Sequence, residues 1–153
     1  GTNISPKPAQ QPHPPIWFGA NVEAALRRAV KYGDGWTGAG SSSRDDFPGN
    51  VDRVQELLAA EGRTQKDFPI SKRVYLAIDD DEELALRRLT EWSGNYYGNP
   101  KIPELAAIWG STAKVQEKLA EWSELGVDEF ALNPVYDYER HAEQLADLTG
   151  LRG

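Results

Sequence analysis

Apolar positions along the chain follow two periods, one typical of strands and one typical of helices. Residues 16–18, Ile-Trp-Phe, form a short apolar run of the kind that builds a buried strand. Over residues 22–30 the apolar side chains recur at helical spacing, and the basic side chains lie off that stripe. We therefore expect a strand at 16–18 and then an amphipathic helix, with Asn21 as its N-cap and Gly33 as its C-terminal cap.

The same succession of strand and helix recurs along the chain. Further strands are predicted around Trp36 and Thr37, at 70–78 and at 127–132. Further helices are predicted from the apolar stripe Val51, Val54, Leu57 and Leu58 up to Gly62, from Asp79–Asp81 to about Trp92, from 110–112 to Gly126, and over 138–148. Strands separated by whole helices run parallel, because the crossover returns the chain in the same direction. The pattern predicts an α/β fold of four parallel β/α units, either a small open sheet or half of a (β/α)8 barrel.

Proline and glycine mark the irregular segments. Residues 1–15 contain five prolines, which exclude a helix or a central strand. We expect an extended Pro-rich entry segment over 1–15 and one domain over 16–153. Within that domain, residues 38–49 read as a mobile Gly/Ser loop and residues 95–103 as an irregular insertion.

Composition and charge exclude several classes of partner. The chain has 24 acidic and 17 basic side chains, a net charge of −7, and no basic block. This balance argues against nucleic acid or an anionic membrane as a partner. No apolar run is long enough to span a bilayer, and the absence of cysteine excludes disulfides and thiolate metal sites. We expect a cytoplasmic protein. The chain contains no Met and begins with Gly1, as expected for a trimmed N-terminus or a piece of a longer protein.

The turn after the first predicted strand is the strongest candidate for chemistry. It consists of Gly19, Ala20 and Asn21. Glycine lets the backbone approach a bulky anion, and the first amides of a helix have no acceptor within the helix. Such amides bind phosphate. The sequence therefore predicts a phosphate site at this turn, the alternative being an ordinary turn capped by Asn21.

Other candidates are weaker. Trp36 and Thr37 lie at the end of the next strand, the edge where parallel folds bind ligands, so Trp36 is expected to line the site and Thr37 to donate to phosphate. A packed strand tryptophan is the alternative. Residues 110–112 are a candidate for a second anion contact, but helix capping alone also explains them and is the favoured interpretation. His13 and His141 have no acid at catalytic spacing, so structural roles are expected for both. No catalytic residue and no metal ligand is assigned.

Two stretches of the sequence follow a recognisable family pattern. The first comprises residues 6–20 (Pro-Lys-Pro-Ala-Gln-Gln-Pro-His-Pro-Pro-Ile-Trp-Phe-Gly-Ala), 24–29 and 32–36. The second comprises residues 109–112, Val115, Leu119 and 126–129. Together they resemble the luciferase-like monooxygenase superfamily over nearly the whole chain, but only over the C-terminal half of its members. The chain departs from the pattern at Ala20 and Asn21, where many relatives have a second Gly and a small residue.

The resemblance has definite implications. It implies the C-terminal half of a (β/α)8 TIM barrel, taken from an oxidoreductase or monooxygenase that acts on a small-molecule substrate. The implied cofactor is FMN or a deazaflavin coenzyme of the F-420 type, with its phosphate at Gly19–Asn21. The missing first half would supply much of the ring pocket and the catalytic groups. The alternatives are a non-catalytic half-barrel that binds or self-associates, as a homodimer covering its free sheet edges, and a small open-sheet phosphate-binding enzyme.

Overall fold

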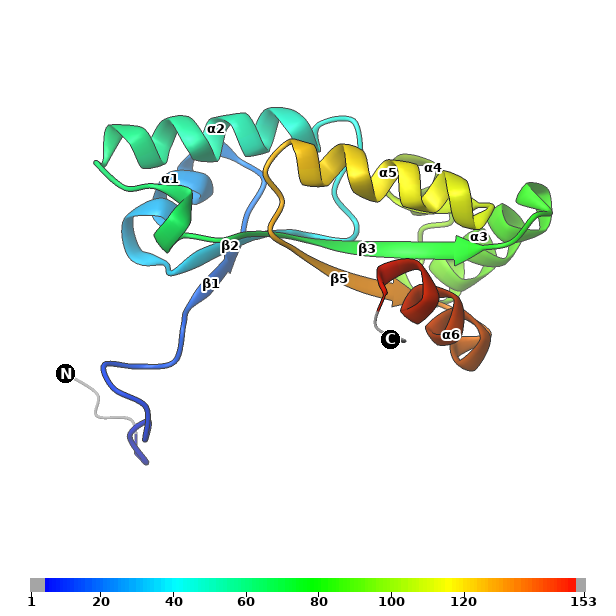
Figure 1. The fold of residues 1–153 in the computed structure, drawn as a ribbon, viewed down its shortest axis with the longest axis horizontal. Helices are drawn as coiled ribbons and strands as arrows, with labels where there is room; N and C mark the ends of the chain where they lie inside the picture. Colours follow the sequence, from blue (N-terminus) through cyan, green and yellow to red (C-terminus); the bar gives the residue numbers. More distant parts are fainter. Residues whose placement is uncertain (1–4, 151–153) are drawn as a thin grey trace.

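Five parallel strands form one sheet in the computed structural model of the chain, which describes residues 5–150 (Figure 1). The strands are β1 (Trp17–Gly19), β2 (Gly35–Gly38), β3 (Ile70–Ile78), β4 (Ile108–Gly110) and β5 (Glu129–Pro134). The helices are α1 (Glu23–Tyr32), α2 (Phe47–Ala60), α3 (Glu82–Tyr97), α4 (Ile102–Ala106), α5 (Thr112–Glu124) and α6 (Tyr138–Thr149), with a short 3-10 turn at Gln65–Asp67. The predicted α/β class and parallel strands are confirmed.

The long strand β3 is the centre of the sheet. Ser71 pairs with Thr37 of β2 and with Glu129 of β5, so β2 and β5 lie along opposite edges of β3. Leu76 pairs in the same way with both β4 and β5, which places β4 on the edge shared with β2, beyond the end of that strand. The strands β1, β2, β3 and β5 therefore follow one another in chain order. The short strand β4 is an addition that the sequence pattern did not predict.

The two faces of the sheet are covered differently. We call the face of Ile70, Lys72 and Val74 the outer face, and the face of Ser71 and Arg73 the inner face, because successive strand residues point to opposite sides. The main hydrophobic core joins the outer face to buried residues of α1, α2 and α5. Figure 1 shows α2 and α5 lying along one side of the sheet. A smaller core joins the carboxyl end of the inner face to α3.

Several predicted helix boundaries are correct. The stripe of α2 is buried as expected, and α6 begins at Tyr138. Asp81 caps α3 by accepting a hydrogen bond from the Leu84 amide at 2.9 Å. Ser111 caps α5 by accepting from the Lys114 amide at 3.3 Å. Side-chain oxygens at these positions satisfy amides that have no partner inside the helix.

Other boundaries were wrong. The N-cap of α1 is Val22, which has an extended backbone. Its carbonyl accepts hydrogen bonds from the amides of Ala25 and Leu26, so Asn21 is not the cap. The helix α3 continues past Trp92 to Tyr97, and α4 fills part of the expected insertion at 95–103. The expected loop at 38–49 ends before Phe47, where α2 begins. Among residues 5–150, no helix is long and apolar enough to cross a membrane.

Candidate functional site

The turn between β1 and α1 presents free backbone donors at the carboxyl edge of the sheet. Gly19 and Asn21 are exposed, whereas Ala20 is buried. Within residues 5–150, no acceptor receives a hydrogen bond from the amides of residues 21–24. A Cβ atom placed on Gly19 would meet no protein atom within 4 Å, so the turn is open to an approaching ligand. The turn therefore offers free amides and space for a bulky anion.

The first turn of α1 also contains a carboxylate, that of Glu23. Arg53 donates from Nε and Nη2 to its two oxygens at 2.8 and 2.6 Å, and Arg27 Nε lies 2.6 Å from one of them. The hydrogen bonds from Arg53 are the main cause of a pKa lowered to about 2 for Glu23. Arg53 Nη1 also donates to Glu56 at 2.6 Å, so two guanidinium groups face two carboxylates. The side-chain charges here therefore balance, and it is the positive end of the helix dipole that favours an anion at the free amides.

Trp36 reaches the same turn from the outer face. Its side chain is fully buried and stacks on Phe47, with ring centroids 5.7 Å apart. The indole Nε1 donates to the carbonyl oxygen of Ala20 at 2.9 Å. The indole ring itself is enclosed by the core. Trp36 therefore contributes to the predicted site only by this hydrogen bond, which holds the turn in place.

Thr37 lies on the inner face, in register with Gly19. Its hydroxyl is 3.2 Å from the hydroxyl of Ser71 on the neighbouring strand, and Thr37 itself is half-buried. Gly19, Thr37 and Ser71 therefore form one row across three strands. The structure brings the predicted pair Gly19 and Thr37 onto the same face and adds Ser71. The strand alternation of residues 70–78 already placed Ser71 on the face opposite Lys72, but not beside Thr37.

The next row toward the carboxyl end has a second polar group, which the sequence analysis did not single out. Arg73 is exposed on the inner face and donates from Nε and Nη2 to Asn133 Oδ1 of β5 at 3.0 and 2.7 Å. Its guanidinium lies 5.1 Å from the ring centroid of Tyr75. Burial, aided by a hydrogen bond with the Tyr97 hydroxyl, raises the pKa of Tyr75 to about 12. Tyr75 therefore stays protonated at neutral pH.

On the outer face, Lys72 anchors the loop after β2. Its side chain is fully buried, and Nζ donates to the Ala39 carbonyl at 2.7 Å and to the Ser42 hydroxyl at 3.2 Å. The ammonium also lies 4.9 Å from the Phe47 ring centroid and 5.9 Å from that of Trp122. Burial lowers the pKa of Lys72 to about 8. The loop therefore depends on a buried cation for part of its attachment to the sheet.

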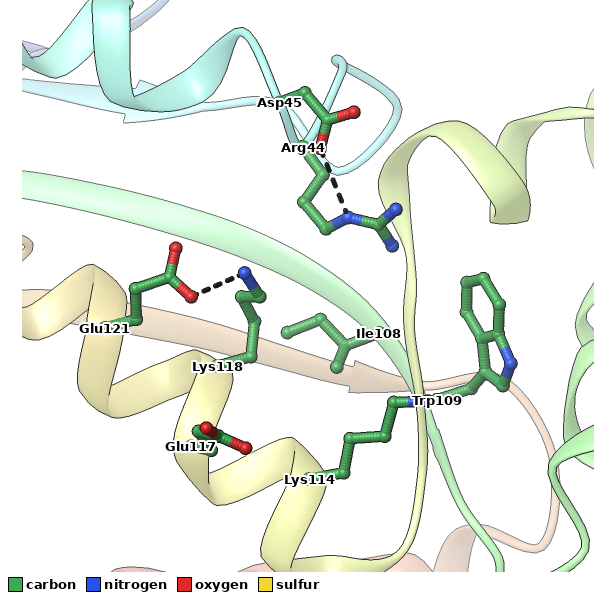
Figure 2. Close-up of a pocket in the computed structure, with 8 residues that line it drawn as sticks. All are labelled: Arg44, Asp45, Ile108, Trp109, Lys114, Glu117, Lys118 and Glu121. Carbon is green, nitrogen blue, oxygen red and sulfur yellow. Dashed lines mark hydrogen bonds and ion pairs between the residues drawn. The ribbon is translucent and has the colours of Figure 1, made fainter.

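A separate pocket of about 520 Å³ lies between this loop, β4 and α5 (Figure 2). Its lining residues are Arg44, Asp45, Ile108, Trp109, Lys114, Glu117, Lys118 and Glu121. Lys118 pairs with Glu121 at 2.5 Å, Lys114 pairs with Glu82 at 2.7 Å, and Arg44 donates to the Ala107 carbonyl at 2.8 Å. The lining holds three cations and three carboxylates. This balance selects for neither anions nor cations.

The two histidines lie apart from these groups. His141 is buried in α6, accepts from the Ile78 amide through Nε2 at 2.9 Å, and has its Nδ1 3.1 Å from the Asp137 carbonyl. Burial lowers the pKa of His141. His13 is exposed in the entry segment. Within residues 5–150, no group of three or more His, Asp or Glu side chains is arranged to hold a metal ion.

A family model described as luciferase-like monooxygenase matches residues 1–101. The chain belongs to this family. It is 32% identical over 88 residues to the FMNH(2)-dependent dimethylsulfone monooxygenase of Pseudomonas putida, a match covering 58% of the chain and 23% of that protein. The family that the sequence resembles is therefore confirmed.

Solved structures of two further proteins share the fold. Coenzyme F420 dependent tetrahydromethanopterin reductase from Methanopyrus kandleri matches 86% of the chain and 48% of its own length, with a TM-score of 0.66 and 17% identity. EDTA monooxygenase from Chelativorans matches 97% of the chain and 46% of its own length, with a TM-score of 0.66 and 15% identity. The chain thus spans less than half the length of each of these relatives.

Proposed function

We propose that the chain is part of a flavin- or deazaflavin-dependent oxidoreductase, and that the turn at Gly19, Ala20 and Asn21 holds the cofactor phosphate. The observation that supports this most directly is the set of amides at residues 21–24, which have no acceptor within residues 5–150. The open space at Gly19 fits a bound phosphate. When bound, FMN or a deazaflavin supplies hydride or oxygen-transfer chemistry.

The remaining predicted residues have distinct parts in this proposal. Thr37 presents its hydroxyl on the same row as Gly19 and donates to the phosphate or to the chain that joins it to the ring. Trp36 is a positioning residue, because its indole fixes the carbonyl of Ala20 inside the turn. The chain's own contribution is thus to bind and orient the phosphate end of the cofactor.

We also propose that residues 16–153 form the C-terminal half of a (β/α)8 barrel. The chain order of β1, β2, β3 and β5 supports this, because barrel strands are sequential whereas doubly wound sheets reverse at a switch point. The relatives' length supports it too, since the chain matches 48% and 46% of two of them. The other half would complete the inner face, on which a small-molecule substrate would bind.

The proposal is tested by titrating FMN, riboflavin and a deazaflavin coenzyme of the F-420 type into the full-length protein that contains this chain. Riboflavin has the ring of FMN without its phosphate. We expect FMN or the deazaflavin to bind, and riboflavin to bind at least about tenfold more weakly than FMN if FMN is the cofactor, as expected for loss of charge-assisted hydrogen bonds. Binding of neither cofactor would refute the proposal.

Self-association is a second candidate function. Within residues 5–150, β1 pairs only with β2 and β5 pairs only with β3, so each has a free edge. Unpaired edges of this kind associate with another strand. Sedimentation equilibrium of the 153-residue chain distinguishes the two candidates. A stable dimer favours self-association, and a monomer counts against it.

A further inference from the structure

We infer that Arg73 is the centre of a second anion-binding site, on the inner face of the sheet, for a carboxylate, sulfonate or phosphate group. This inference rests on the proposed function in one respect, because it assigns the inner face to a small-molecule ligand. The site is distinct from the turn at Gly19–Asn21. Its components are Arg73, Asn133 and Tyr75, with the hydroxyls of Thr37 and Ser71 in the adjacent row.

The charge of Arg73 is not cancelled by any ion pair within the described part of the chain. No carboxylate of residues 5–150 lies within ion-pair distance of its guanidinium, although acidic side chains outnumber basic ones in the chain. By contrast, Arg53 and Arg88 each form a hydrogen bond of 2.6 Å to a carboxylate. The carboxylate nearest in register is Glu129, which pairs with Ser71 one row away and forms no such contact. An arginine left without a counterion on a ligand-facing surface is a candidate anion site.

The guanidinium is nevertheless held in place. Asn133 Oδ1 accepts from both Nε and Nη2, and the ring of Tyr75 packs against the group at 5.1 Å. Because Asn133 is neutral, these hydrogen bonds fix the plane of the Arg73 guanidinium without neutralising its positive charge. Within residues 5–150, Nη1 of Arg73 donates to no acceptor. A planar donor fixed in advance loses less freedom when it binds an oxyanion, which favours binding.

The position of Arg73 separates it from the turn. Gly19 and Ser71 share a row two strands apart, and Arg73 lies in the next row along β3. Strand spacing and rise place the backbones of Gly19 and Arg73 about 12 Å apart. The guanidinium of Arg73 is also hydrogen-bonded to Asn133 of β5, on the edge of β3 away from β1 and β2, so one phosphate does not contact both the turn and this guanidinium. If the turn takes the cofactor phosphate, Arg73 takes a second anionic group, carried by the substrate or by another part of the cofactor.

The test follows the NMR signal of the Arg73 Nε–H group in the full-length protein during titration with inorganic sulfate at constant ionic strength. We expect sulfate to shift this signal in a saturable way. Arg73→Gln lacks this signal, so its sulfate affinity is compared with that of the wild type by isothermal titration calorimetry. It should fall about tenfold or more, the loss expected for a charge-assisted hydrogen bond. Asn133→Asp is a second variant, which gives Arg73 an internal carboxylate and should weaken binding in the same direction. Arg87→Gln, at an exposed arginine of α3, is the matched control and should change nothing.

Sulfate titrations in the presence of FMN or riboflavin distinguish the possible sources of the anion. If sulfate still shifts the Arg73 signal after saturation with FMN, the anion comes from the substrate. If FMN displaces sulfate and riboflavin does not, the cofactor phosphate binds at Arg73, and its assignment to the turn at Gly19–Asn21 fails. If FMN does not bind at all but sulfate still binds at Arg73, the cofactor proposal fails and the anion site stands. A signal that sulfate leaves unmoved, or unchanged sulfate affinity in Arg73→Gln, would overturn the inference.

Discussion

Replacing Lys72 by methionine should stabilise the protein at neutral pH. Lys72 is fully buried, no carboxylate of residues 5–150 forms an ion pair with it, and methionine has a similar length without the charge. Burial lowers the pKa of Lys72 from 10.5 to about 8. Each pKa unit corresponds to about 1.4 kcal/mol, so the protonated lysine reduces the free energy of unfolding by about 3 kcal/mol. The loss of two hydrogen bonds offsets about 1 kcal/mol or more of this gain.

The hydrogen-bond loss is small because the acceptor has other donors. The Ala39 carbonyl also accepts from the Ser42 amide at 3.2 Å and from the Ser42 hydroxyl at 2.6 Å. It therefore stays satisfied when the ammonium of Lys72 is removed. We expect Lys72→Met to raise the free energy of unfolding at pH 7 by about 1–3 kcal/mol, as seen when buried charges are replaced by apolar groups of similar volume.

The pH dependence gives the sharper test. Between about pH 8 and 10.5 the unfolded wild type binds more protons at Lys72 than the folded protein does, so wild-type stability rises with pH in this window. The advantage of Lys72→Met should therefore be full below pH 8 and should decline toward pH 10.5. The measurement is urea unfolding followed by tryptophan fluorescence, with Lys66→Met at an exposed lysine as the control. A Lys72→Met protein that is less stable than wild type at pH 7, by an amount independent of pH, would refute the reasoning.

Three further predictions concern the turn, a helix cap and the buried histidine. Trp36→Phe removes the donor to the buried Ala20 carbonyl and should lower the free energy of unfolding by about 1–3 kcal/mol in urea titrations, with a parallel loss of cofactor affinity. Asp81→Ala removes the cap on the Leu84 amide and should cost about 1 kcal/mol in the same assay, whereas no loss would show that the cap is unimportant. Because burial lowers the pKa of His141, stability should fall as pH drops below the unfolded value of 6.5, and His141→Gln should flatten that dependence in pH-resolved unfolding.

The sequence was sufficient where local pattern decides the structure. The apolar stripe of α2 and the serine cap of α5 depend on residues within one element. The end of α3 depends instead on distant contacts, because Trp92 and Tyr97 pack against Tyr75 of β3. The strand β4 has only three residues and pairs only with the carboxyl end of β3. It is too short to show the alternation of apolar and polar residues that predicts a strand.

The candidate site also has parts that local sequence predicts and parts that depend on distant contacts. A helix that follows a strand through glycine was visible in the sequence, and the structure leaves its first amides free. Trp36 and Thr37 were both assigned to the site from the sequence. Adjacent strand residues point to opposite faces, and in the structure Trp36 is buried in the core whereas Thr37 lies on the inner face beside Ser71. The pairing of Arg73 with Asn133 depends on the register of two strands 60 residues apart in the chain. Neither Arg73 nor Asn133, taken alone in the sequence, predicts this pairing.

The most direct test of the central claim is the FMN affinity of Gly19→Asp in the full-length protein. A Cβ atom at Gly19 would meet no atom within 4 Å beyond the neighbouring residues, so the variant should fold, while its carboxylate repels a phosphate at the turn. Gly49→Asp is the matched control, because that position is also open. The account predicts that FMN binds Gly19→Asp at least about tenfold more weakly than wild type or Gly49→Asp, with riboflavin binding unchanged. Equal FMN affinity in all three proteins would contradict it.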